Sequence, residues 1–376
     1  MAALVKAAGA CFDPSARPSF PDVMSDNIIV DTATRIFSDL CEPQTINAAE
    51  EGKWPAELWN ALEESGLTLT WVPDNLGGAG AEMADGFAVL RAAGRFAAPV
   101  PLAETLMAGW LLAQGGIEAP PGPMTIAPVH EDGNITLGAD GKLHGRARHV
   151  PFARTAKHIA VLAKRNGAPV VALVAAEGLG IREGTSLAGE PQDTVGFDAV
   201  TPIATGAASA GLDPVALARL GAAVRAQQIA GALEHILDQS VQWSLDRVQF
   251  GRPISKFQAV QHNLATLAGE VAAAGAAADG AAETIAQEGP ASERALLDVA
   301  VAKVRVGEAA SNGAAIAHQV HGAMGFTYEH SLHHATRRLW AWREEFGNET
   351  LWAGRLGRLI AEQGADDLWP FLTHGT

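Results

Sequence analysis

The chain has 376 residues, more than a usual single domain holds, so two or three domains with a substantial core are expected. With 48% hydrophobic and 18% charged residues, the composition is that of a folded protein and excludes a disordered chain. The formal net charge of -15 and the absence of a basic stripe argue against nucleic acids or anionic membranes as partners.

The N-terminus and the cysteines favour a cytoplasmic protein. Residues 1–23 are interpreted as an N-terminal extension, or as a start-codon artefact, because Met24 opens a segment with helical spacing. The first 12 residues are too short to span a bilayer and resemble an export signal only faintly. Cys11 and Cys41 lack metal-ligand spacing, so neither a zinc site nor a disulfide scaffold is expected, and a reducing compartment fits.

Residues 24–122 are predicted to form an N-terminal α-helical domain. Apolar residues recur at helical spacing from Ile28 to about Leu112, interrupted by the Pro- and Gly-rich turn Val72–Gly80. The run Gly77–Met83 lacks the third Gly and the following acidic residue of a dinucleotide fingerprint, so it is interpreted as a loop.

Residues 123–209 are predicted to form a small antiparallel β barrel or sandwich. The helical pattern ends at Pro120–Pro123, and short apolar runs with β-like alternation follow. Asp-Gly and Asn-Gly pairs separate these runs, as hairpin turns with positive φ require.

Residues 210–376 are predicted to form a four-helix bundle. Asp213 and Pro214 provide an N-cap and a first-turn proline for a long amphipathic helix. Further helices are predicted at about 256–287, 292–320, 331–346 and 348–363. Long helices joined by short loops are typical of a bundle, so the fold class is mainly α with a small β domain.

A first motif stands where the long helix should end. The residues Asp246–Ile254 read DRVQFGRPI, and Phe257–His262 follow them. An Arg at a helix end, beside an aromatic residue and a Gly turn, offers a forked donor and close backbone approach to a pyrophosphate. The candidate ligand-binding residues here are Arg247, Gln249, Phe250 and Gln258.

A second motif, HQVHGAMGF at His318–Phe326, stands at the end of a later predicted helix. The glycines give the turn the freedom to bring backbone amides close to an anion. The candidate binding residues here are Gln319, Gly322 and Gly325.

With the order of helices, β domain and bundle, these motifs resemble the acyl-CoA dehydrogenase family from about Ile28 to Leu359. The resemblance implies FAD, whose ADP half is met by both motifs between two paired subunits. It also implies an acyl-CoA thioester substrate and an electron-transfer flavoprotein as acceptor. The assembly would be a homo-oligomer, or a hetero-oligomer with a second dehydrogenase-like subunit.

The middle domain departs from the family pattern. The family contacts the flavin ring with a Thr-Glu-Pro stretch and a later Trp-Ile-Thr/Ser segment, whereas this chain has residues 125–130 and 145–153 without those patterns. Arg146, Arg148, His149 and Arg154 form a local positive patch in an acidic protein. The patch is interpreted either as a site for an anion such as a CoA phosphate or as a solvated strand face.

The catalytic base is a second departure. The position of the family's catalytic Glu holds Phe346, and the alternative position on the earlier helix, Leu220–Ala222, has no carboxylate. Glu345, one residue out of register, is the candidate base, provided that the loop is rebuilt. The other interpretation of Glu345 is a surface ion pair with an arginine at 337, 338 or 343.

Three functions stay open at this stage. The first is an FAD-dependent acyl-CoA dehydrogenase that makes the trans-2-enoyl product from a linear, aromatic or steroid-derived acyl group. The second is a non-catalytic, cofactor-sharing subunit whose partner supplies the catalytic Glu and the flavin-ring contacts. The third, a related flavin oxidase or monooxygenase, ranks last.

Overall fold

The structure of the chain is a computed structural model that describes residues 27–364, 366, 368 and 369, so the predicted extension at 1–23 lies outside the described residues. The described part of the chain begins with five α-helices and two short 3-10 turns. Their bounds are α1 Ile28–Leu40, α2 Pro43–Glu50, α3 Ala56–Glu64, η2 Leu67–Leu69, η3 Asp74–Leu76, α4 Met83–Arg95 and α5 Leu102–Gln114. Local capping favours these helices: the Asn27 side chain accepts a hydrogen bond from the Ile29 amide, 3.1 Å away, and Glu82 opens α4 with a capping box.

The middle of the chain forms one open mixed sheet. Its strands are β1 Met124–Ala127, β2 Ile135–Leu137, β3 Leu143–Pro151, β4 His158–Arg165, β5 Ala168–Ala175, β6 Gly180–Arg182, β7 Gln192–Val200 and β8 Ala204–Ala207. The strand order is β6-β7-β3-β2-β4-β5-β8, with β1 also paired to β4. The antiparallel prediction holds for most pairs, but β1 and β2 each pair with β4 in parallel. The path ends at β6 and β8, so the sheet does not close into a barrel.

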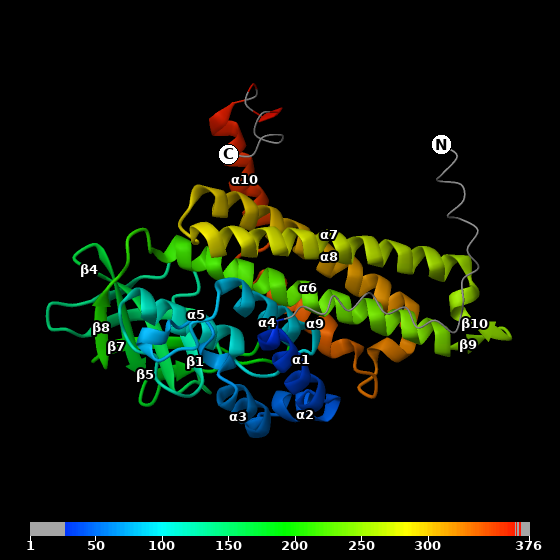
Figure 1. Cartoon of the computed structure of the whole chain (residues 1–376), viewed down its shortest axis with the longest axis horizontal. Coiled ribbons are helices and arrows are strands. Elements are labelled where there is room, and N and C mark those ends of the chain that lie inside the picture. The colour runs from blue at the N-terminus through cyan, green and yellow to red at the C-terminus, as the bar shows by residue number, and fades with distance from the viewer. Residues whose placement is uncertain (1–26, 365, 367, 370–376) are drawn as a thin grey trace.

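The C-terminal part is a helical bundle. Its elements are α6 Pro214–Asp246, β9 Val248–Gln249, β10 Arg252–Pro253, η4 Ile254–Lys256, α7 Gln258–Glu288, α8 Glu293–His321, η5 Gly322–Phe326, α9 Leu332–Glu344 and α10 Glu349–Gln363. The helices α6, α7 and α8 run side by side along the molecule, with the large sheet at one end and the β9–β10 hairpin at the other (Figure 1). The predicted fold class is confirmed. No helix of the described residues is long and apolar enough to cross a bilayer.

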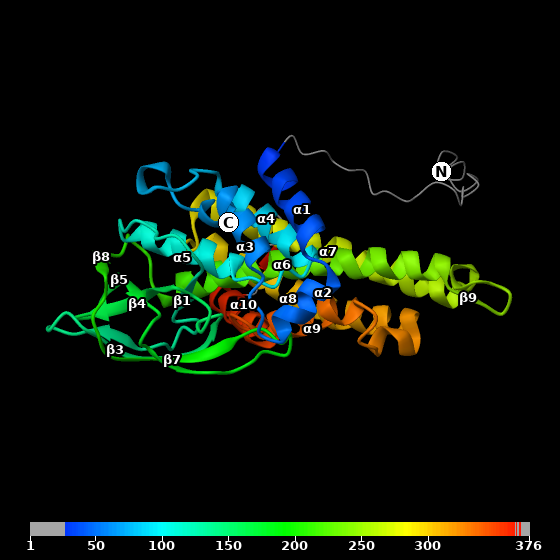
Figure 2. The ribbon, with the colours of Figure 1, turned by 90° about the horizontal axis from the view of Figure 1, so that it is seen from below.

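Glycines let α4 and α6 meet backbone to backbone, which fixes the long helix against the N-terminal helices (Figure 2). A Cβ atom on Gly231 would lie 1.9 Å from the Arg91 carbonyl oxygen, and one on Gly94 would lie 2.2 Å from the Gln228 carbonyl oxygen. Any larger side chain at either position would push the two helices apart. Arg225 lies on the same helix, α6, and is buried there.

Two buried histidines and one half-buried histidine should make the fold sensitive to acid. Burial lowers the pKa of His235 to about 4, of His321 to about 4 and of His334 to about 3. A histidine in the unfolded chain titrates near pH 6.5, so as the pH falls the unfolded chain binds protons before the folded chain does. Between pH 6.5 and its folded-state pKa, each of these histidines lowers the free energy of unfolding by about 1.4 kcal/mol per pH unit. The stability is therefore complete above pH 6.5 and is lost as the pH falls towards 4.

The test compares urea unfolding of the wild type and His334→Gln at pH 7 and pH 5. The glutamine can still donate to the Asn47 side-chain oxygen, which lies 2.7 Å from the His334 Nε2. We expect the loss of stability between the two pH values to be smaller in the variant by about 1–2 kcal/mol. An equal loss in both proteins would contradict this assignment.

Candidate functional site

The first motif forms the exposed end of α6 and the turn that follows. Arg247 caps the helix, and its guanidinium carbon lies 5.9 Å from the ring centre of Trp243. It forms no ion pair with any described residue. Gln249, Phe250 and Gln258 are exposed, and the Phe250 ring, 92% exposed, is held out by a backbone with a φ of 52°.

The second motif forms the end of α8 and the turn η5. Gln319 and Gly322 are exposed, and a Cβ atom on Gly322, where φ is 61°, would meet nothing within 4 Å. Gly325 is buried, and a Cβ atom there would lie 2.9 Å from the His321 Cβ. Gly325 therefore shapes the turn, while Gln319 and Gly322 offer the accessible groups.

A pair of stacked rings joins the two motifs. Trp243 of α6 stacks on His321 of α8, with ring centres 5.2 Å apart and planes at 22°. Arg247 lies over the same Trp243 ring, one helical turn further on. The end of α6 and the end of α8 are thus neighbours within one chain.

These groups fit the diphosphate of a dinucleotide cofactor. An exposed guanidinium without an acidic partner gives a forked donor, and the open backbone at Gly322 permits close approach of an anion. Ala323, which replaces the family's second glycine, is exposed, so its methyl group is not wedged into the packed core. The seven binding residues stay predictions as cofactor contacts, with Gly325 acting through the shape of the turn.

The candidate base lies in the loop between α9 and α10, where it is turned inwards. Glu345 is 8% exposed, and its Oε2 lies 2.7 Å from the Arg225 Nε. The Arg225 guanidinium, itself buried, also donates to Glu104 at 2.5 Å. The interpretation of Glu345 as a surface ion pair is wrong, because the arginines expected to pair with it form ion pairs elsewhere: Arg337 with Glu50, Arg338 with Glu190 and Arg343 with Glu349.

Buried charges hold this loop in place. Burial raises the pKa of the Glu345 carboxyl, and Arg225 opposes that rise. The Lys303 ammonium group donates to the carbonyl oxygens of Trp342, Arg343 and Glu345 at 3.3, 3.1 and 2.9 Å. Burial lowers the pKa of Lys303 to about 7. The end of α9 and the carboxylate after it are therefore fixed by two cations from two other helices.

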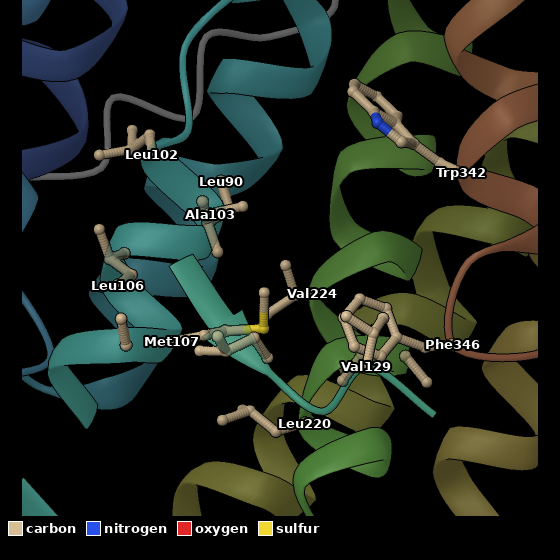
Figure 3. Close-up of a cluster of buried hydrophobic side chains, with 14 of the residues drawn as sticks. Leu90, Leu102, Ala103, Leu106, Met107, Val129, Leu220, Val224, Trp342 and Phe346 are labelled. Carbon is tan, nitrogen blue, oxygen red and sulfur yellow. The ribbon is translucent and has the colours of Figure 1, made fainter. Parts of the chain in front are cut away.

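Phe346, at the position of the family's catalytic Glu, fills the space beside α6. Its ring is buried against Gly221, where an added Cβ atom would lie 2.3 Å from the ring. Figure 3 shows the ring among apolar side chains from α5, α6 and the loop after β1, including Met107, Val129 and Val224. No carboxylate stands at this point of the described structure.

The two sequence patterns with which the family contacts the flavin ring are absent from the β domain. The Thr125 hydroxyl is buried and donates to the Pro151 carbonyl oxygen, 2.7 Å away. Arg154 forms ion pairs with Asp193 and Glu183, both at 2.8 Å, so it is neutralised and leaves the predicted positive patch. Arg146 and Arg148 stay exposed. In the part of the chain that the structure describes, no group of His, Cys, Asp and Glu is arranged to hold a metal ion.

Comparison with known proteins decides the family. The model of the acyl-CoA dehydrogenase N-terminal domain matches residues 25–119, and that of the C-terminal domain matches residues 215–356. The acyl-CoA dehydrogenase FadE27 of Mycobacterium tuberculosis is 30% identical over 366 residues, which cover 90% of this chain and 96% of the relative. The chain belongs to the acyl-CoA dehydrogenase family.

Other members of the acyl-CoA dehydrogenase family are similar over most of the chain. The acyl-CoA dehydrogenase IpdE2 of Mycolicibacterium smegmatis is 28% identical over 309 residues, covering 81% of this chain and 89% of the relative. The fold matches the ChsE4–ChsE5 complex of Mycobacterium tuberculosis with a TM-score of 0.81 at 24% identity, covering 90% of this chain and 97% of the other. The Tcur3481–Tcur3483 steroid ACAD gives 0.77 at 26% identity, covering 89% and 97%.

Sequence reasoning missed the buried charges that surround the base position of this family member. Arg225 lies in a run of apolar helix residues, Glu104 lies in another, and Lys303 lies in a third. A lone charge inside an apolar helix face is costly to bury unless a partner neutralises it. That signal was available in the sequence, although it does not identify which of the lone charges meet.

Proposed function

We propose that this chain is the cofactor-sharing subunit of a heteromeric, cytoplasmic acyl-CoA dehydrogenase. In this assembly the bundle end of the chain, with Arg247 and the Gly322 turn, holds the ADP half of an FAD. The second dehydrogenase-like subunit supplies the flavin-ring contacts and the catalytic carboxylate. The whole complex would oxidise an acyl-CoA to the 2,3-enoyl-CoA and pass electrons to an electron-transfer flavoprotein. When bound, the FAD would accept the hydride that leaves the β-carbon.

The observation that carries the proposal is the apolar ring of Phe346 at the base position. Removal of the α-proton needs a carboxylate within hydrogen-bond reach of that proton. Phe346 has no such group, and Glu345 is bound to Arg225 in a buried pair. To act as a base, Glu345 would have to break its buried bond to Arg225, which would then keep Glu104 as its partner. We therefore assign Glu345 a structural role.

The bundle end and the β domain also support the proposal that the two subunits share the cofactor site. The diphosphate-binding groups at the bundle end are exposed and without acidic partners, whereas the β domain offers a Thr125 hydroxyl already used by the chain's own backbone. The names of two similar structures point to two-chain assemblies, ChsE4–ChsE5 and Tcur3481–Tcur3483, and the latter is described as a steroid ACAD. We propose a bulky, ring-bearing acyl-CoA as the substrate of the complex.

Expression with and without the second subunit tests the proposal. Purified alone, the chain should contain well under one FAD per chain, and acyl-CoA should not bleach its flavin absorbance. Co-expressed with a dehydrogenase-like chain from a neighbouring gene, it should form a yellow complex that acyl-CoA bleaches. Full flavin occupancy and turnover by the chain alone would overturn the proposal.

Two variants of this chain within the complex test the proposed roles of Arg247 in binding the cofactor and of Glu345 in the structure. Arg247→Gln should lower the flavin content, because the forked donor to the diphosphate is lost. Glu345→Gln should keep the bleaching rate within about threefold of the wild type, whereas loss of a true base costs about 10²–10⁴-fold. Circular dichroism of both variants checks that each is folded.

A further inference from the structure

A groove of about 660 Å³ opens where α4, α6 and α7 meet in the helical part of the molecule (Figure 1). One wall comes from α4, between residues 82 and 91, and the other comes from the end of α7, between residues 279 and 287. Gln227 of α6 lies between the two walls. The volume of the groove lies within the range of small-molecule sites, about 300–1,000 Å³.

This groove is separate from the base position and from both cofactor motifs. Gln227 stands two residues after Arg225, and side chains two residues apart on an α-helix point about 200° from each other. Arg225 meets Glu104 and Glu345, whereas Gln227 meets Asp279 of α7. The groove therefore opens on the other side of α6, and its lining contains no residue of the two motifs.

The Gln227 side chain lies in the groove with one of its polar atoms unused. It is 3% exposed, and its Nε2 donates to the Asp279 Oδ1 at 3.1 Å. Its Oε1 accepts no hydrogen bond from any described residue. A buried acceptor without a partner costs about 1–3 kcal/mol. Because the last torsion of a glutamine is soft, the amide can turn this oxygen towards a donor in the groove.

The rim of the groove carries an excess of negative charge. The carboxylates are Glu82, Asp279 and Glu283, and the basic residue of the lining is Arg91. Arg91 is already used, because its guanidinium pairs with Glu234 at 2.5 Å and with Asp279 at 2.6 Å. Glu82 and Glu283 form no ion pair with any described residue. The field in the groove therefore favours a cation.

The α4 wall is apolar and held in place from behind. The Phe87 ring packs edge-on against the Trp71 ring, with ring centres 4.9 Å apart. The Trp71 Nε1 donates to the Met83 carbonyl oxygen at 3.0 Å. On the α7 wall, Ala282 and Ala286 leave room opposite these side chains. The groove thus offers a preformed apolar surface beneath an acidic rim.

We propose that this groove binds a small organic cation with an apolar body, an alkyl or arylalkyl primary amine. The apolar body would lie between the α4 wall and the two alanines. The ammonium group would donate to the Gln227 Oε1, close to the carboxylates of the rim. An ionised donor forms a hydrogen bond about twice as strong as a neutral one. This inference does not depend on the proposed function.

Calorimetry with the full chain at low salt tests the site, with phenethylamine as the probe. The neutral 2-phenylethanol and the anionic 3-phenylpropanoate serve as analogues of similar size. We expect saturable binding of the amine and binding at least about tenfold weaker for both analogues, because neither brings a positive charge to the acidic rim. Higher salt should weaken the binding of the amine.

Two variants of α7, each with a matched control, place the binding in the groove. Ala286→Phe fills the groove with a ring and should abolish the binding of the amine, whereas Ala276→Phe, at an exposed position outside the groove, should leave it unchanged. Glu283→Gln removes a rim charge and should weaken the binding by about threefold or more. Glu288→Gln removes an exposed charge outside the groove and should bind like the wild type.

The absence of saturable amine binding overturns the inference, and so does equal binding by Ala286→Phe and the wild type. Binding of the alcohol as tight as that of the amine overturns the assignment to a cation. The test is distinct from that of the proposed function. Arg247→Gln should leave amine binding unchanged, and Ala286→Phe should leave the flavin content of the complex unchanged.

Discussion

Replacement of Arg225 by Met is expected to lower the free energy of unfolding by about 3–5 kcal/mol. The Arg225 side chain is 2% exposed and neutralises two buried carboxylates, Glu104 at 2.5 Å and Glu345 at 2.7 Å. Methionine fills a similar volume but leaves both carboxylates without the guanidinium group that bonds to them. Chemical denaturation of the purified chain at pH 7 measures the loss.

Glu345→Gln is the matched control for this prediction. Glutamine keeps an oxygen that accepts from Arg225, which stays paired with Glu104, so we expect a cost of only about 1 kcal/mol. Lowering the pH should reduce the difference in the free energy of unfolding between Arg225→Met and the wild type. Burial already raises the pKa of Glu345, and loss of its cation raises it further, so the folded variant binds protons more readily than its unfolded state as the pH falls. A loss below 1 kcal/mol for Arg225→Met would show that these carboxylates reach solvent.

The sequence was most informative where local rules decide the structure. The long helix begins at Pro214 after the Asp213 cap, as predicted, because an N-cap and helical periodicity act over a few residues. The motif at Arg247 and the turn at Gly322 were recognisable for the same reason, since each needs particular residue types within a single short segment. The fold class could therefore be predicted, and the candidate diphosphate-binding residues stay predictions.

The surroundings of the base position could not be predicted, because they depend on contacts between distant segments. Glu345 meets Arg225, 120 residues away, and no spacing rule links the two. The parallel pairing of β1 with β4 brings residues 124–127 beside 158–161, where the turn residues alone suggested antiparallel pairs. Arg154 looked free in the sequence and is neutralised by Asp193, which comes from β7. In each case tertiary packing chose among partners that the sequence left equivalent.

Replacement of Gly221 by Ala is expected to destabilise the chain by about 1–3 kcal/mol. The added methyl group would lie 2.3 Å from the Phe346 ring, which is enclosed by the apolar cluster of Figure 3. Elsewhere in a helix the same change stabilises by about 1 kcal/mol, because alanine has the higher helix propensity. Whether Gly221→Ala lowers or raises the free energy of unfolding therefore shows whether the Phe346 ring stays beside α6.

Gly280→Ala, in α7, is the matched control, because its added methyl group would meet nothing within 4 Å and should be stabilising. The smaller variant Phe346→Leu should remove most of the penalty of Gly221→Ala in a double-mutant cycle. If Gly221→Ala instead behaved like Gly280→Ala, the Phe346 ring would be free to swing away from α6. The proposal that the Phe346 ring occupies the base position of this subunit would then lose its structural basis.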